Sequence, residues 1–205
     1  MKIRSLVFAA VLALPMTAVA QAPTPTTPST DKTKAAGKMT DDEVKIVAHL
    51  HHVNVMEIDM GKDAKAKGTA AVKKYGDMLI KEHTTADKEL AAMAKKKGVA
   101  KIPAAQPMTE AEKAEMKTQH DEMAALKKLK GADYDREYLR LMVDGHEKEL
   151  AKSDVFISTA QDADLKTALE ARKTTLQRHA DAAKELQKGN AQASTTPTPP
   201  AKTTK

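Results

Sequence analysis

Apolar side chains recur every three to four residues between positions 39 and 190, which is the spacing of one face of an α-helix. One such stripe consists of Val72, Gly76, Leu79, His83, Ala86, Leu90 and Met93. A second consists of Leu165, Leu169, Arg172, Leu176, His179, Ala183 and Leu186. No run alternates β-branched and polar residues as a half-buried strand would. The pattern therefore predicts an all-α domain.

Local signals divide this region into five helices, at about 40–67, 69–97, 109–130, 133–160 and 164–188. Thr40 with Glu43, and Thr109 with Glu112, match the capping box that starts a helix. Glycines follow four of the segments, where a left-handed C-cap favours glycine: Gly68, Gly98, Gly131 and Gly189. Four long helices and a shorter third one predict an antiparallel four-helix bundle with an extra connecting helix.

The two ends differ from this core. Lys2 and Arg4, the apolar run 6–14 and the Ala18–Ala20 cleavage pattern predict a signal peptide over 1–20, cut between Ala20 and Gln21. The alternative is that this N-terminal segment stays on the protein as an uncleaved anchor. Residues 21–38 and 191–205 are rich in Thr, Pro and Ala, which predicts disordered segments around the domain at 39–190. We expect a periplasmic or secreted protein.

The formal net charge of +6 is compatible with a nucleic-acid or anionic-membrane partner. However, the excess lies in the signal peptide and the two flanks, and residues 39–190 carry 27 basic and 27 acidic side chains. With only five aromatic residues, the chain also lacks a stacking surface for nucleic acid. We expect no nucleic-acid partner and no transmembrane segment in the mature chain. Interspersed acidic residues also disfavour membrane-surface association.

Each long helix has a polar residue within its apolar stripe: Glu57, His83, His146 and His179. At about 1.5 Å per residue, all four fall in the middle third of the bundle. Three histidines and a carboxylate at one height suit zinc, copper or iron. Asn54, Tyr138 and Glu149 are then the candidates for residues that hydrogen-bond to the ligands and orient them. The alternative is a structural layer of hydrogen-bonded polar residues, because burying such groups unpaired is unfavourable.

A weaker candidate lies on the first helix. His49, His52 and Met56 follow i, i+3, i+7 spacing, and histidine with methionine suits copper. The same face carries charged residues, which is typical of a solvated surface. Cysteine is absent, so thiolate ligands and disulfides are excluded.

Four segments together resemble an exported bacterial family of ferritin-like bundles, catalogued as domain of unknown function 4142. They are 54–61 (NVMEIDMG), 75–83 (YGDMLIKEH), 134–146 (YDREYLRLMVDGH) and 176–186 (LQRHADAAKEL). The resemblance covers about residues 39–188. It implies a ferritin-like fold and export, and leaves the activity open because the family's function is unsettled.

The sequence does not indicate a reaction. Di-iron enzymes of ferritin type need Glu-x-x-His on two helices, whereas the positions three before the histidines hold Ile80, Val143 and Leu176. Our first interpretation is a non-enzymatic, stress-related or binding module of the cell envelope, with an unknown protein or small ligand as partner. The alternative is a metal-binding or metal-dependent redox protein that uses the His/Glu set.

Overall fold

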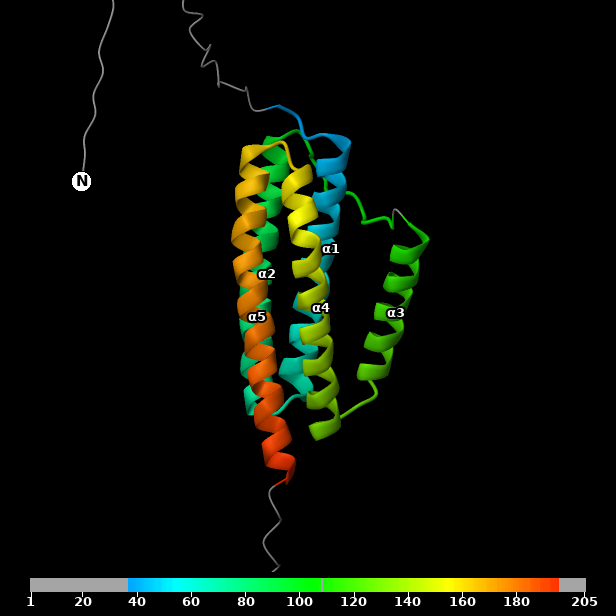
Figure 1. Ribbon diagram of the computed structural model, residues 1–205, viewed down its shortest axis with the longest axis vertical. Coiled ribbons are helices and arrows are strands. Elements are labelled where there is room, and N and C mark those ends of the chain that lie inside the picture. The colour runs from blue at the N-terminus through cyan, green and yellow to red at the C-terminus, as the bar shows by residue number, and fades with distance from the viewer. Residues whose placement is uncertain (1–36, 108, 196–205) are drawn as a thin grey trace, which may run out of the picture. The chain divides into compact units, whose positions relative to one another are not determined.

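The computed structural model describes residues 37–107 and 109–195, with side chains described as far as residue 190. The predicted signal peptide and nearly all of the first linker lie outside these residues, as does the tail from 196. The described part contains five helices and no strand, which confirms the all-α bundle. They are α1 (Asp41–Lys67), α2 (Ala70–Lys96), α3 (Glu110–Leu126), α4 (Gly131–Thr159) and α5 (Ala163–Thr195) (Figure 1).

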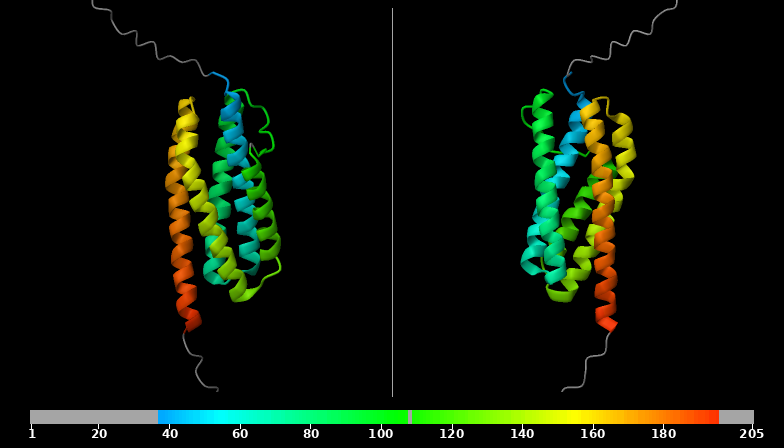
Figure 2. Two further views of the ribbon diagram at one scale, coloured as in Figure 1. Left: turned by 45° about the vertical axis from the view of Figure 1, so that its right-hand side comes forward. Right: turned by 90° about the vertical axis from the view of Figure 1, so that its left-hand side faces the viewer.

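Two helical hairpins form the bundle. Helix α1 packs on α2, α4 packs on α5, and the hairpins meet through α1 with α4 and α2 with α5. Helix α3 runs back along the outside of this bundle beside α4 (Figure 2). Because α3 returns the chain to the opposite end, α4 begins where α1 ends and runs antiparallel to it. The predicted connecting helix thus sets the direction of the second hairpin.

The first hairpin depends on two glycines at the α1–α2 crossing. A Cβ atom on Gly61 would lie 2.8 Å from the carbonyl oxygen of Gly76, and one on Gly76 would lie 2.7 Å from that of Gly61. Both distances are shorter than a carbon–oxygen contact allows. The absence of side chains here therefore lets the two backbones approach closely.

Both predicted capping boxes are present, at Thr40–Glu43 and at Thr109–Glu112. The glycine predictions were less accurate. Only Gly98, with φ +89°, has a left-handed conformation after a helix. Gly131, with φ +58°, begins α4 instead. Gly68 is extended with φ −70°, and a Cβ there would meet a Val72 methyl at 2.6 Å, so space rather than handedness requires glycine.

Helix α5 is longer than predicted. It passes through Gly189 and ends at Thr195, seven residues beyond the expected 188. A Cβ on Gly189 would meet nothing within 4 Å, so no tertiary contact selects a turn there. Residues 191–193 are Ala-Gln-Ala, which favour helix. The first residue in the sequence that strongly disfavours continuing the helix is Pro197.

Buried carboxylates join the hairpins at both ends. At one end, Glu43 Oε1 accepts hydrogen bonds from the backbone amides of Gln161 (2.8 Å) and Asp162 (2.6 Å) in the α4–α5 turn. At the other end, Asp135 on α4 accepts from the amide of Thr69 in the α1–α2 turn at 3.2 Å. These bonds fix the relative height of the two hairpins, and with it the level at which their polar residues meet.

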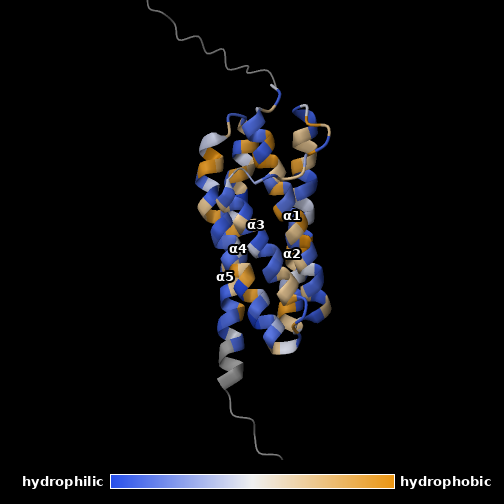
Figure 3. Cartoon of the chain, turned by 90° about the vertical axis from the view of Figure 1, so that its right-hand side faces the viewer, coloured by the Kyte–Doolittle hydropathy of each residue, from blue (hydrophilic) through white to orange (hydrophobic). Residues whose placement is uncertain are grey.

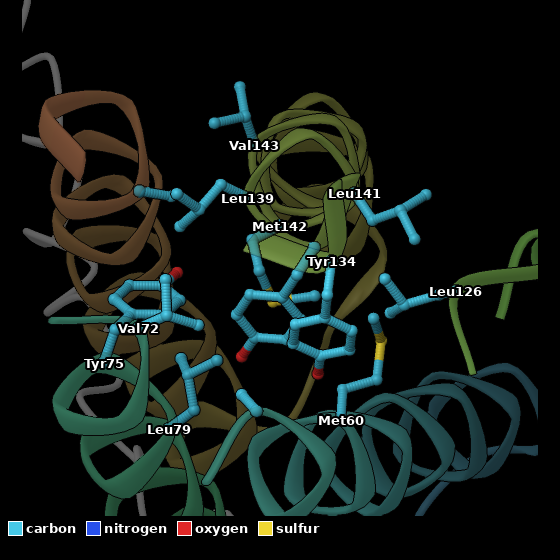
Figure 4. Packing of buried hydrophobic residues seen from close by; sticks show 13 residues of the cluster. Met60, Val72, Tyr75, Leu79, Leu126, Tyr134, Leu139, Leu141, Met142 and Val143 are labelled. Atoms are coloured by element: carbon cyan, nitrogen blue, oxygen red, sulfur yellow. The ribbon is translucent and has the colours of Figure 1, made fainter. Parts of the chain in front are cut away.

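The core has two apolar clusters along the bundle axis. One contains Met60, Leu79, Tyr134, Tyr138 and Met142 with their neighbours (Figure 4). The other contains Ile46, Leu50, Leu90, Leu165 and Leu169 with theirs. On every long helix the polar stripe residue lies in sequence between the members of these clusters. The polar layer therefore separates two halves of an otherwise apolar interior.

The outward positions are more polar. Hydrophilic and hydrophobic residues are interspersed along the helices (Figure 3). None of the helices in the described ranges combines the length and apolar character that a membrane crossing requires.

Candidate metal centre

The structure brings three of the predicted ligands together. His83 from α2, His146 from α4 and His179 from α5 are 4%, 1% and 0% exposed. One ring nitrogen of each lies within 4.8 Å of the other two. The ring centroids are 5.2 Å apart for His146 and His179, and 5.3 Å apart for His83 and His179. Both hairpins contribute, so the cluster forms only when the bundle is assembled.

Two of the rings are held at Nδ1. His83 Nδ1 lies 2.9 Å from Asn54 Oδ1, and His146 Nδ1 lies 2.7 Å from the carbonyl oxygen of Met142. A carbonyl oxygen can only accept a hydrogen bond, so each Nδ1 is the protonated nitrogen in this arrangement. The lone pair of a neutral ring then resides on Nε2 in both residues. His83 Nε2 is buried and has no hydrogen-bond partner among the described residues.

The third ring is held from its other side. His179 Nε2 donates to Glu82 Oε2 at 2.8 Å, and Arg178 forms a two-pronged ion pair with the same carboxylate. Because a carboxylate accepts, Nε2 carries the proton and the lone pair of neutral His179 resides on Nδ1. Hydrogen bonds from Arg178 hold the pKa of the Glu82 carboxyl below its usual range despite the opposing effect of burial, which keeps this acceptor ionised.

This arrangement leaves lone pairs facing one another. His146 Nε2 and His179 Nδ1 are 3.3 Å apart, although the outer hydrogen bonds have placed the proton of each ring on the opposite nitrogen. Two acceptors at that distance repel unless a cation or a proton lies between them. Fixing of ligand rings by a carboxylate or carbonyl at the outer nitrogen is the usual support of a histidine metal site.

Protonation of a ring nitrogen would relieve this repulsion, but it is unfavourable in the buried cluster. Burial, with help from the neighbouring rings His179 and His146, lowers the pKa of His83 to about 3. Burial lowers the pKa of His179 to about 4, although Glu82 opposes the shift. At neutral pH both rings are therefore uncharged, which is the form that coordinates metal ions.

Glu57, the predicted fourth ligand, lies beside the cluster and not among its converging nitrogens. Its Oε1 is 4.0 Å from His146 Nδ1, on the edge of that ring that bonds to Met142. Oε2 is buried and has no hydrogen-bond partner in the described part of the chain. Burial raises the pKa of this carboxyl, with the nearby Glu149 adding to the effect.

The predicted supporting residues occupy three different environments. Asn54 does hold a histidine, as described above. Tyr138 is fully buried in the apolar cluster, and its hydroxyl has no partner among the residues described. Glu149 instead accepts hydrogen bonds from His49 (3.0 Å) and Arg172 (2.8 Å). The hydrogen bond from His49 and the positive charge of Arg172 outweigh the effect of burial and lower the pKa of Glu149 to about 2.

A cavity of about 630 Å³ between α2 and α5 leads to two of the rings. His83 and His179 form part of its wall, together with Asn54, Glu82 and Arg172. The wall also includes apolar side chains, among them Leu50 of α1, Leu90 and Met93 of α2, and Leu176 of α5. The histidine cluster is thus buried within the bundle but adjoins a space that a small molecule can occupy.

The family model for the domain of unknown function DUF4142 matches residues 28–186, which is most of the chain. The chain belongs to the DUF4142 family. This confirms the resemblance that four sequence segments indicated. No curated protein sequence matches this DUF4142 protein significantly.

Two solved structures of CopM are similar to this DUF4142 chain. One is CopM in the Cu(I)-bound form, with a TM-score of 0.56, and the other is the Ag-bound form obtained by co-crystallization, with 0.53. Each is 15% identical to this chain and covers 72% of it and 94% of CopM. At that identity the likeness establishes a shared helical fold.

The outward set on α1 lines a different cavity, of about 730 Å³, together with residues of α3 and α4. His49 is half-buried, and its Nε2 lies 3.0 Å from both oxygens of Glu149. His52 is exposed and Met56 is half-buried. Across residues 37–107 and 109–190, the one group of three or more histidine and acidic residues placed to hold an ion is the interior triad.

Sequence reasoning missed Glu82 and Arg178. A signal was present, because Glu82-His83 and Arg178-His179 are adjacent pairs on the two helices. Neighbouring residues on a helix point about 100° apart. When the histidines face inward, their neighbours can therefore meet at the rim, where Arg178 pairs with Glu82.

Proposed function

We propose that this DUF4142 protein binds one copper ion through His83, His146 and His179. The observation that carries the proposal is the convergence of three ring nitrogens whose opposite nitrogens are occupied by Asn54, Met142 and Glu82. Three imidazoles in a fixed tautomeric state offer three lone pairs to one point. Imidazole is a good ligand for copper, zinc and iron.

Charge favours copper in its monovalent form. The ligands are neutral, Glu82 is already paired with Arg178, and Arg172 is close enough to lower the pKa of His83 further. The penalty for burying an ion rises with the square of its charge, so a monocation is accommodated more easily than a dication. The Cu(I)- and Ag-bound CopM structures on the same fold support this choice.

The opposing hypothesis is a purely structural polar layer. Such a layer would satisfy its polar atoms internally, because unpaired buried groups are unfavourable. Here His83 Nε2 and Glu57 Oε2 are buried with no partner in the described ranges, and two lone pairs face each other at 3.3 Å. These features fit a ligand set better than a completed hydrogen-bond network.

Native mass spectrometry of tag-free, metal-free protein tests the proposal. We expect one Cu(I) per chain, bound in preference to equimolar Zn(II) and Fe(II), and no retained ion in H146A/H179A. The matched control is His51→Ala/His120→Ala, which removes two histidines outside the cluster and should retain the ion. An unmetallated wild-type protein, or equal occupancy in H146A/H179A, would contradict the proposal.

We place this activity in the cell envelope. The support is the sequence of residues 1–20, which has a basic start, an apolar run and an Ala-x-Ala pattern. N-terminal sequencing of the protein from the periplasmic fraction should give Gln21 as the first residue. Recovery of the intact Met1 form from that fraction would contradict cleavage.

A further inference from the structure

Two residues with unsatisfied polar atoms line the same cavity. Arg172 Nη1 and His83 Nε2 are both buried, neither has a hydrogen-bond partner in the described part of the protein, and both residues form the wall of the α2–α5 cavity. Arg172 is also close enough to His83 to lower its pKa by charge repulsion. A guanidinium donor and a histidine acceptor in the wall of one cavity thus have no partner among the described residues.

Arg172 is held in place for this role. Its Nη2 donates to Glu149 Oε2 at 2.8 Å, and the side chain is 15% exposed. Glu149 is itself fixed by His49 at 3.0 Å. Glu149, itself held by His49, therefore restrains one arm of the guanidinium, while the other arm has no hydrogen-bond partner among the described residues. A planar guanidinium of this kind recognises carboxylates well.

The remaining wall limits what can bind. Leu50, Leu90, Met93 and Leu176 give the cavity an apolar interior. Of the three acidic residues in the wall, Glu82 pairs with Arg178 and Asp164 pairs with Lys97 at 2.8 Å, and the third is Glu89. The space suits a ligand with one anionic group and an apolar body.

We propose that the α2–α5 cavity binds a small organic carboxylate that bonds to Arg172 and completes the coordination of the ion held by the histidines. The inference rests on the proposed metal site. Three protein ligands with an open position are typical of metal centres that exchange a ligand, whereas closed sites hold the ion for structure or storage. The cavity supplies that open position with an anchor for negative charge.

The test uses the full chain loaded with Cu(I) and then oxidised to Cu(II), because the divalent ion gives a charge-transfer band when azide coordinates. We expect azide to produce the band and butyrate to displace it. Butyrate should bind at least about tenfold more tightly than formate, because its three additional carbons are buried against apolar side chains.

Arg172→Gln should weaken azide and butyrate binding about tenfold or more, since a charge-assisted hydrogen bond is lost. The matched control is Lys173→Gln, which removes one positive charge from the exposed neighbour that pairs with Asp154 at 2.6 Å. It should change both affinities less than twofold. If R172Q does not fold or bind copper, Arg172→Lys is compared instead, and we expect an intermediate loss because charge is kept without the planar fork.

Failure of this inference can be distinguished from failure of the metal site. Copper bound at one per chain without an azide band, equal binding by R172Q and wild type, or equal affinity for formate and butyrate would overturn the carboxylate site and leave the copper proposal standing. A chain that binds no copper would overturn both.

Discussion

The interior histidines and the outward set on α1 use similar residue types in different surroundings. In the interior, His83, His146 and His179 come from three helices, and each has its outer nitrogen engaged by a neutral or paired acceptor. On α1, His49 is engaged by the ionised Glu149, and His52 is exposed.

The difference shows that spacing on one helix is a poor guide to a metal site. Residues at i, i+3 and i+7 share a face, but His49 is already bound to an anion from another helix. A site needs several lone pairs directed at one point and acceptors behind them. Among the described residues, the meeting of the two hairpins supplies both at the interior triad.

The largest expected difference comes from removing one ligand in each set. His83→Ala should weaken Cu(I) binding on the order of 100-fold or more, since one of three ligands is lost. His49→Ala/Met56→Leu should change it less than threefold. Competition titration with a Cu(I) chelator measures both. Comparable losses in the two variants would mean that the outward set also holds the ion.

The second-largest effect on copper affinity is expected at Glu82, which accepts the hydrogen bond from His179 Nε2. Glu82→Gln removes the charged partner of His179 Nε2, and we expect copper affinity to fall between tenfold and 100-fold. Glu185→Gln is the control, because Glu185 is an exposed residue of α5 that pairs with Lys188 at 2.7 Å. An E82Q protein with wild-type affinity would show that orientation of the ring does not depend on this carboxylate.

Acid should destabilise the metal-free interior cluster. The pKa values of His83 and His179, about 3 and about 4, lie below the 6.5 of an unfolded histidine. Between these values the unfolded chain binds more protons, so stability falls as pH falls, by about 2 kcal/mol per ring from pH 6.5 to 4.5.

Urea unfolding of metal-free protein at pH 8, 6.5 and 4.5 measures this effect. H83Q/H179Q should lose most of the slope between pH 6.5 and 4.5. The range stops at 4.5 because protonation of Glu149, with its pKa lowered to about 2, adds a separate loss below that point. An unchanged slope in H83Q/H179Q would place the acid sensitivity elsewhere.

The smallest effect is expected at Tyr138. Its hydroxyl is buried with no partner among the described residues, so Tyr138→Phe should leave copper affinity within twofold and raise stability by up to about 1 kcal/mol. Tyr75→Phe is the matched comparison, because the Tyr75 hydroxyl donates to the carbonyl oxygen of His179 at 3.0 Å and its loss should be destabilising by about 1 kcal/mol. A copper defect in Y138F would restore Tyr138 as a supporting residue.

Much of the fold could be predicted from the sequence. Helical spacing and the capping boxes at Thr40 and Thr109 depend on local chemistry, so the helix number and most starts were found. Glycine roles were harder, because Gly61 and Gly76 are required by a contact between two helices. The continuation of α5 past Gly189 likewise depends on the absence of a neighbour there.

For the candidate site, the residues could be predicted but not their relations. A polar residue on an apolar stripe identifies His83, His146 and His179 one helix at a time. The rotation of each helix decides that Glu57 faces the outer edge of His146 and that Glu149 reaches His49. Helix rotation follows from packing between the hairpins, which spacing along one chain does not encode.

X-ray absorption at the copper edge of the Cu(I)-loaded full chain tests the central claim most directly. The account predicts three imidazole nitrogens around one ion per chain, no sulfur neighbour, and a weaker imidazole signal in His83→Ala. A sulfur neighbour such as Met56, or an unchanged spectrum in H83A, would contradict it.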